Sequence, residues 1–231
     1  MRLSKPVNGV LSNQAVHFSA IFIFRRQPCL TSTEHPMRDF SRRNFVTLFS
    51  GLCCSLPLLA QAKSLTVSSV RKAEELSAKE RQQHEFFMQK AIAQAAKNPA
   101  YPFGAIIADL QSGKIFSEGV NTGAENPTFH GEMVAINEYV HKHGNQGWQQ
   151  MTLYTTGEPC SMCMSAIAWA GITRVVWASS VQKIRASGIG QIDIPAAEIA
   201  FRAREFYQPV ALISGVLATQ TDNLFDQRTR S

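Results

Sequence analysis

Apolar residues recur at helical spacing in the stretch that follows residue 76. Ser77 and Glu80 form a capping-box pattern, in which each side chain satisfies a free backbone amide at a helix start. We expect this helix to run to about Lys97, and His84 within it to be an exposed surface residue. The apolar positions fall about once per turn and predict a buried face made of Phe86, Met88, Ala91, Ile92 and Ala95.

Five short apolar runs bounded by turn residues predict β-strands. They span residues 103–109, 114–118, 151–156, 174–178 and 210–217. The first two form a hairpin, and the later ones alternate with helical segments. A β-α-β-α-β order implies right-handed crossovers, which place the two intervening helices on one side of the sheet. The pattern therefore predicts an α/β fold.

The last part of the chain gives a weaker pattern. Residues 180–206 show two helical stretches, broken by the Gly- and Pro-containing segment 188–195. Residues 219–227 are mostly polar. We expect them to form a tail that Leu224 and Phe225 anchor, either onto the body or across a dimer.

Two short stretches carry side chains with metal chemistry, and each opens a predicted helix. They are His130-Gly131-Glu132 and Pro159-Cys160-Ser161-Met162-Cys163. One imidazole and two thiolates make three ligands, the number that a catalytic zinc takes while its fourth position stays open to water. Cys160 and Cys163 lie one helical turn apart, at a helix start that favours thiolates. Glu132 is near enough to handle protons without binding the metal.

These motifs resemble those of the cytidine/deoxycytidylate deaminase superfamily, over about residues 102–178. The stretches 126–132 and 158–163 are most similar to its purine-acting branch, which contains bacterial guanine deaminase and the tRNA adenosine deaminases. The resemblance implies a cytidine-deaminase-like three-layer α-β-α sandwich with a central mixed five-stranded sheet. It also implies a homodimer.

The resemblance also implies a reaction. One zinc ion per chain would be held by His130, Cys160 and Cys163, and Glu132 would shuttle protons while a nucleobase or nucleoside is hydrolytically deaminated. A guanine- or guanosine-like purine is the first expectation. Residues 187–191 carry no acid that could contact the edge of guanine, which leaves related nucleobases and nucleosides open.

The resemblance implies substrate contacts for three further residues. Asn121 would hydrogen-bond the ring, Trp169 would border the base, and the backbone amide of Glu158 would help to orient substrate or water. From the residues alone, Asn121 is equally consistent with a turn, and Trp169 with core packing.

Other functions remain open at this point. A tRNA adenosine deaminase fits the same motifs. A non-catalytic zinc or thiol protein of the cell envelope would need a fourth protein ligand to close its metal site, and none is evident in the sequence. A redox C-x-x-C of the thioredoxin type would leave His130 and Glu132 unexplained.

The charge of the chain is concentrated near its N-terminus. The whole sequence has 23 Lys/Arg and 17 Asp/Glu; seven and two of these lie in residues 1–62, which leaves 16 and 15 in residues 63–231. The body is therefore nearly neutral and lacks the basic stripe expected of a nucleic-acid surface. A small-molecule substrate is the expected partner.

The pattern of residues 1–62 indicates a leader with a twin-arginine signal peptide. Arg42 and Arg43 precede an apolar run over 46–60, which ends in Ala60-Gln61-Ala62. That run is shorter than the roughly twenty residues of a membrane span, so we expect no stable span in the mature protein. Cleavage near Ala62 and a periplasmic location follow; an uncleaved anchor or a cytoplasmic location are the alternatives.

The sequence thus predicts three regions: the leader over 1–62, a linker over 63–76 and a deaminase domain over 77–231. The leader itself has two possible starts, because translation from Met37 would leave residues 1–36 untranslated. Peptides from before Met37 in the precursor would exclude that start.

Overall fold

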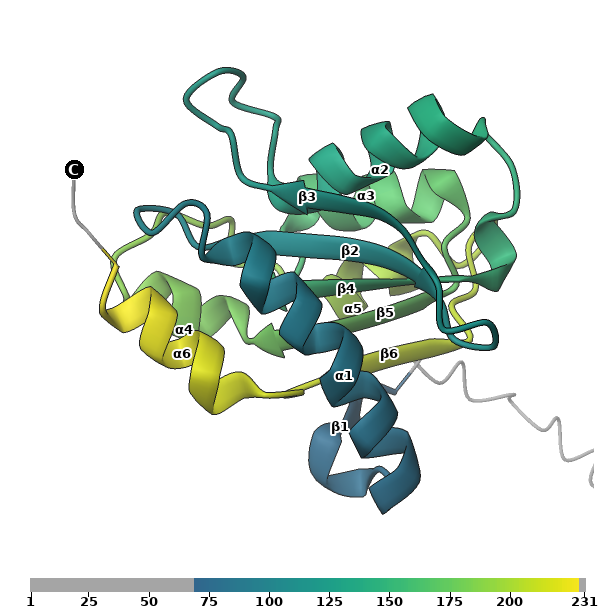
Figure 1. The fold of residues 1–231 in the computed structure, drawn as a ribbon, viewed down its shortest axis with the longest axis horizontal. Coiled ribbons are helices and arrows are strands. Elements are labelled where there is room, and N and C mark those ends of the chain that lie inside the picture. Colours follow the sequence, from purple (N-terminus) through teal and green to yellow (C-terminus); the bar gives the residue numbers. More distant parts are fainter. Residues whose placement is uncertain (1–68, 229–231) are drawn as a thin grey trace, which may run out of the picture. The chain divides into compact units, whose positions relative to one another are not determined.

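The protein was analysed as a computed structural model, which describes residues 69–228. The predicted signal peptide, its cleavage site and the alternative start at Met37 lie outside the described residues. Figure 1 shows a twisted sheet with helices on both faces. The α/β class and the three-layer arrangement predicted from the sequence are confirmed.

The sheet has six strands in the order β1-β6-β5-β4-β2-β3. The hairpin strands β2 and β3 are antiparallel, and β2 also runs antiparallel to β4. The strands β4, β5, β6 and β1 are mutually parallel. Their bounds are β1 Arg71–Lys72, β2 Gly104–Asp109, β3 Ile115–Val120, β4 Met151–Gly157, β5 Arg174–Ser179 and β6 Ala211–Ser214.

The sixth strand, β1, lies in the segment 63–76, which the sequence predicts to be a linker. β1 pairs in parallel with β6, with Arg71 opposite Ile213. A short 3-10 helix, η1 (Ala73–Glu75), follows it, and Leu76 is buried against the sheet. The expected linker over 63–76 is therefore structured at its C-terminal end, and the expected five-stranded sheet has one strand more.

Six α-helices and a second 3-10 helix, η2 (Trp148–Gln150), complete the described part of the chain. Their bounds are α1 Ala78–Ala95, α2 Gly131–His143, α3 Ser161–Ala170, α4 Val181–Ala186, α5 Ala196–Arg202 and α6 Ala218–Asp226. The capping box before α1 is confirmed, because the Ser77 and Glu80 side chains each bond the other's backbone amide. None of the described helices is long and apolar enough to cross a membrane.

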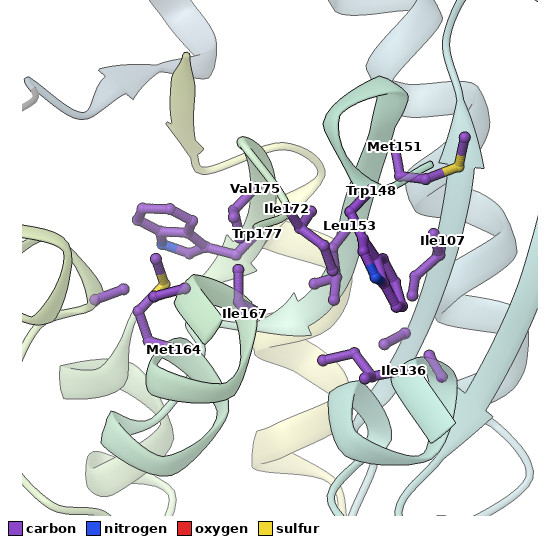
Figure 2. Close-up of a cluster of buried hydrophobic side chains, with 14 of the residues drawn as sticks. Ile107, Ile136, Trp148, Met151, Leu153, Met164, Ile167, Ile172, Val175 and Trp177 are labelled. Atoms are coloured by element: carbon purple, nitrogen blue, oxygen red, sulfur yellow. The ribbon is translucent and has the colours of Figure 1, made fainter. Parts of the chain in front are cut away.

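The helices α2, α3 and α5 cover one face of the sheet. Between them and the strands lies the largest apolar cluster, part of which Figure 2 shows, with Trp148 and Leu153 near α2 and Trp177 near α3. This placement agrees with the right-handed crossovers predicted for the parallel strands. The two helices that begin at the metal motifs therefore lie side by side in one layer.

The helix α1 covers the opposite face, and its burial differs in detail from the prediction. Met88, Ala91 and Ala95 are buried as expected, but Phe86 is exposed and Phe87 takes its place in the core. His84 is also buried, against the expectation of a surface residue, because its Nδ1 lies 2.9 Å from the Tyr154 hydroxyl of β4.

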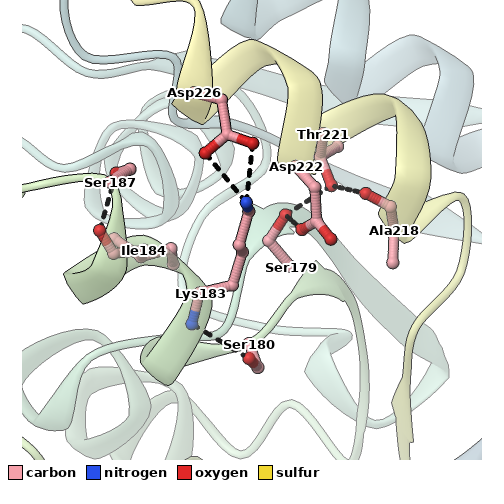
Figure 3. A network of polar contacts seen from close by, with 9 residues as sticks. All are labelled: Ser179, Ser180, Lys183, Ile184, Ser187, Ala218, Thr221, Asp222 and Asp226. Atoms are coloured by element: carbon pink, nitrogen blue, oxygen red, sulfur yellow. Dashed lines mark hydrogen bonds and ion pairs between the residues drawn. The ribbon is translucent and has the colours of Figure 1, made fainter.

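The helix α6 replaces the polar tail that the sequence predicted. Phe225 anchors it and is fully buried against Phe103. Polar contacts hold its other side: the Ser179 hydroxyl bonds Asp222 and Thr221, and the Lys183 ammonium pairs with Asp226 (Figure 3). The anchor was predicted correctly, whereas the helix was missed.

Candidate active site

Three metal-ligating side chains meet where α2 and α3 begin. His130 is the N-cap residue of α2, and Cys160 is the N-cap residue of α3. Cys163 follows one turn into α3, so both sulfurs face the same side. The ligand atoms of the three residues all lie within 4.8 Å of one another, and this is the one such group found among the described residues.

The spacing fits a single tetrahedral ion. His130 Nδ1 lies 3.6 Å from the sulfur of Cys160 and 3.6 Å from the sulfur of Cys163. A nitrogen and a sulfur bound to one tetrahedral zinc, at bond lengths of ~2.1 and ~2.3 Å, lie about 3.6 Å apart. One imidazole and two thiolates are also the donor types that zinc prefers. The donor set and its geometry therefore suit zinc, with a fourth position left for water.

The contact between the two thiols shifts their pKa values in opposite directions. The contact with the Cys163 thiol lowers the pKa of Cys160 to about 4. The same contact raises the pKa of Cys163 well above its ordinary value. The Cys160 sulfur in turn raises the pKa of His130. The site is thus built around negative charge on sulfur, which is the charge that a divalent cation neutralises.

Glu132 lies beside this group, in the first turn of α2. It is only 3% exposed, and its Oε1 accepts a hydrogen bond of 3.2 Å from the Thr155 hydroxyl of β4. Burial raises the pKa of this carboxyl, and the negative charge of Cys160 adds to the effect. A buried carboxyl with a raised pKa is suited to both accept and release a proton.

A cavity of ≈ 580 Å³ opens onto His130. That size suits a nucleobase or nucleoside. Its walls come from the segment between α1 and β2, the loop after β3, the N-cap of α2 and the segment after α4. The lining residues are Asn98, Ala100, Tyr101, Phe103, Asn121, Gly123, Ala124, Pro127, His130, Ile189, Gly190 and Gln191. No carboxylate is among these described residues, in line with the acid-free stretch noted over 187–191.

Asn121 lies in the wall of this cavity, as its predicted role requires. Its Oδ1 accepts a bond of 3.1 Å from the Gly123 amide, and its backbone oxygen accepts one of 2.8 Å from Asn98. The side chain therefore has both the fixed orientation of a turn residue and a position from which it can meet a ring. The turn interpretation is thus observed, and the contact with the substrate ring stays a prediction.

The structure does not bring the other two predicted substrate residues into the cavity. Trp169 is 77% exposed on the outer side of α3, where it stacks on Phe206. Within one chain, the Trp169 ring therefore neither lines the cavity nor packs in the core. The Glu158 carboxylate bonds the backbone amides of Val181 and Ala196, and the Glu158 amide donates to the Ser179 carbonyl. All three polar groups of Glu158 are thus occupied by the protein.

Several residues of the site were not found from the sequence. Thr155 holds Glu132, but it looks like any polar residue in a strand. Asn98 directly follows the predicted end of the first helix, where a polar residue is no sign of a site, yet it lines the cavity and bonds the Asn121 backbone. Tyr101 and Gln191 had no spacing signal, because the fold alone brings them near His130.

Comparisons with known proteins agree with this site. Residues 81–179 match the family model of the cytidine and deoxycytidylate deaminase zinc-binding region. Guanine deaminase of Bacillus subtilis is 34% identical over 137 residues, which are 54% of this chain and 85% of that protein. A tRNA-specific adenosine deaminase of Streptococcus pyogenes is 38% identical over 103 residues, 42% of this chain and 64% of that protein.

This chain therefore spans less than two thirds of that tRNA-specific enzyme. Among solved structures, guanine deaminase from Nitrosomonas europaea superposes with a TM-score of 0.51 at 19% identity, over 78% of this chain and 96% of that one. At this level of identity the likeness concerns the fold.

Proposed function

This chain belongs to the cytidine and deoxycytidylate deaminase family, as a zinc-dependent hydrolase that deaminates a nucleobase or nucleoside, and we propose that its substrate is a guanine- or guanosine-like purine. The main support is the similarity to a guanine deaminase, and the cavity agrees with it. The chain covers 85% of the guanine deaminase of Bacillus subtilis, and its cavity suits a purine in size and opens directly onto His130.

The metal centre uses His130, Cys160 and Cys163 as ligands. Zinc, when bound there, makes a water molecule nucleophilic near neutral pH. The chain supplies the rest of the site. The two N-cap positions fix the ligands on rigid helices, and Phe103, whose ring is nearly parallel to that of His130, shields the imidazole on one side.

Glu132 moves the protons. Its carboxylate would take one proton from the attacking water and deliver it to the ring nitrogen. It would then take the second proton from the added oxygen, as the C–N bond breaks and the carbonyl forms, and pass it to the departing amine, so that ammonia leaves. A group with these successive roles needs a pKa near the working pH, and burial shifts the pKa of Glu132 in that direction. The Thr155 hydroxyl keeps one oxygen in place during these steps.

Asn121 orients the substrate. Because its Oδ1 is held by the Gly123 amide, the side-chain amide presents its nitrogen as a donor to an acceptor on the ring. Such fixed polar groups in a mostly apolar cavity set the direction from which the ring enters.

The test is turnover by zinc-loaded protein comprising residues 63–231. Ammonia release is followed with guanine, guanosine, adenine, adenosine, cytosine, cytidine and a tRNA substrate. We expect release from guanine or guanosine. The Glu132→Gln variant should lose roughly 10²–10⁴-fold in kcat, with its zinc content, measured by atomic absorption, unchanged.

Two results would count against the proposal. Retained turnover in zinc-loaded Glu132→Gln would remove the proton-shuttle role. Turnover of the tRNA alone would favour the other relative, the tRNA-specific adenosine deaminase. The near-neutral charge of residues 63–231 argues against that outcome, because a phosphate backbone is bound through Lys and Arg.

We also propose that the enzyme works in the periplasm after twin-arginine export. The support is the pattern around Arg42 and Arg43 with the Ala60-Gln61-Ala62 site. This route carries folded proteins, so zinc can be bound before the two thiols meet an oxidising compartment. N-terminal sequencing of the envelope fraction should find a start at Lys63; a Lys substitution of both arginines that leaves export intact would contradict the route.

A homodimer is the assembly that we propose. Trp169 and Phe206, 77% and 57% exposed, stack with ring centroids 4.7 Å apart. A pair of aromatic rings on the surface is typical of a contact between proteins.

A further inference from the structure

The segment from 187 to 195, here called the wall segment, forms one side of the cavity. It connects α4 to α5, and its residues Ile189, Gly190 and Gln191 line the cavity. It has no regular secondary structure. Its position therefore depends on what holds its two ends.

One buried carboxylate holds the start of α4, the helix that leads into the wall segment, and the residue directly after the wall segment. The Glu158 Oε2 accepts a bond of 3.0 Å from the amide of Val181, the first residue of α4. The Glu158 Oε1 accepts a bond of 2.8 Å from the amide of Ala196, the first residue of α5. A single side chain thus bridges the helix before the wall segment and the helix directly after it.

The bond from the Ala196 amide to Glu158 replaces a side-chain cap at the start of α5. The residue before α5 is Pro195, and no side chain on that helix caps its first turn. The Ala196 amide would otherwise be a buried donor without a partner, which is costly. The exposed ion pair between Arg185 and Asp193 is the other charged contact across the segment, and exposed pairs contribute little.

Glu158 is also tied to the metal centre through the chain. It lies between β4 and α3, two residues before Cys160, and its own amide donates to the Ser179 carbonyl at the end of β5. The carboxylate that anchors the wall segment and the sulfur that binds metal therefore sit on the same short, fixed loop.

We propose that Glu158 is a positioning residue, which fixes the distance between the metal centre and the wall segment and so sets how tightly the substrate ring is held. This rests on the proposed function in one respect: the ring occupies the cavity beside Ile189 and Gln191. Glu158 does not touch the substrate. It acts through the backbone of the wall segment.

The test is the Glu158→Gln variant in the zinc-loaded protein. A glutamine has one oxygen that accepts, and its amide group cannot accept from the second N–H. One of the two bonds is lost while the side-chain shape is kept. We expect KM to rise about tenfold and kcat to stay within about twofold, with zinc content unchanged. Backbone hydrogen exchange should quicken at the amide that loses its acceptor, Val181 or Ala196, and over the wall segment, while the rest of the protein exchanges as in the wild type.

Glu198→Gln is the matched control. It removes a carboxylate from the first turn of α5, but that carboxylate pairs with Arg202 at the surface. KM, kcat and exchange should match the wild type. Glu158→Asp keeps the two accepting oxygens, so its KM should rise less than the KM of Glu158→Gln.

Two outcomes overturn the proposal. One is unchanged KM and unchanged exchange in Glu158→Gln. The other is a loss of zinc or of kcat at constant KM, which would make Glu158 a support of the metal ligands. If wild-type protein turns over none of the substrates, the proposed function fails, while the exchange measurement still decides whether Glu158 anchors the wall segment.

Discussion

Glu132 and Glu158 are two buried carboxylates near one cavity, and their hydrogen-bond partners divide their roles. Glu158 has both oxygens occupied by backbone amides. Glu132 accepts a single side-chain bond from Thr155, and burial raises its pKa. A buried carboxyl with a raised pKa can exchange protons, whereas a carboxylate whose two oxygens both accept from backbone amides is fixed as an acceptor. The hydrogen-bond partners, more than burial, therefore distinguish the proposed catalytic carboxylate from the structural one.

At the same scale, His84 makes the stability of the protein depend on pH. It is 7% exposed, and burial lowers its pKa below the ordinary 6.5. Two charged groups act on it: Glu80, one turn earlier in α1, opposes the shift, and Arg71 of β1 adds to it. The pKa of Glu80 is about 2, chiefly through its bond with the Ser77 hydroxyl, so its charge does not change near neutrality.

The sign follows from proton binding. The unfolded chain takes up a proton at His84 below about pH 6.5 and the folded protein does so at lower pH, so stability is full above ~6.5 and is lost as the pH falls. We expect the free energy of unfolding, from urea titrations at pH 7.5 to 5.5, to fall less steeply in His84→Gln than in wild type, by up to about 1.4 kcal/mol per pH unit. Acid-driven zinc loss affects both proteins, so their difference isolates His84. Equal slopes would show that His84 does not contribute.

At the scale of elements, two glycines let helices approach the sheet. A Cβ on Gly119 of β3 would lie 2.1 Å from the Gly131 carbonyl and 2.5 Å from the Ala135 amide, both in α2. A Cβ on Gly104 of β2 would lie 2.2 Å from the Ala91 carbonyl in α1. Backbone atoms cannot move aside as side chains do, so either alanine must displace a whole helix.

The two displacements should have different effects on activity. Gly119→Ala and Gly104→Ala should each lower the free energy of unfolding by about 1–3 kcal/mol. Only Gly119→Ala moves the helix that begins with the metal ligand and Glu132, so only it should lose roughly tenfold to a hundredfold in kcat per folded molecule. Chemical denaturation and active-site titration by bound zinc measure both quantities. An equal loss of kcat in the two variants would mean that kcat depends on the overall stability of the protein and not on the position of α2.

Elements also show what the sequence could and could not predict. The helices at His130 and Cys160 were predictable, because the Pro shortly before each of them and the one-turn spacing of the two cysteines are local signals. β1 was not: two residues carry no periodicity, and Arg71 becomes part of a strand only by pairing with Ile213. His84 looked like a surface residue because its partner, Tyr154, lies 70 positions away. Long-range partners decide such cases, and a single sequence does not display them.

For the molecule as a whole, the exposed aromatic pair predicts its assembly. Trp169 lies on α3, the helix that carries both cysteine ligands, and it stacks on Phe206. Leaving both rings in water forgoes about 25 cal/mol per Å² of apolar surface, which a second copy would recover by covering them. The homodimer would thus form beside the helix that carries the metal ligands, which explains why the Trp169 ring is neither in the cavity nor in the core.

Sedimentation of zinc-loaded residues 63–231 at micromolar concentration should therefore give twice the monomer mass. Trp169→Lys places a charge in the contact and should shift the protein to monomer, because an unpaired buried charge is strongly unfavourable. Phe86→Lys is the matched control: Phe86 is also exposed, at 54%, but on α1, across the sheet from α3. It should leave the dimer intact. A monomeric wild type, or a Trp169→Lys dimer as stable as the control, would show that this aromatic pair serves no self-association, and the proposed homodimer would then need another surface.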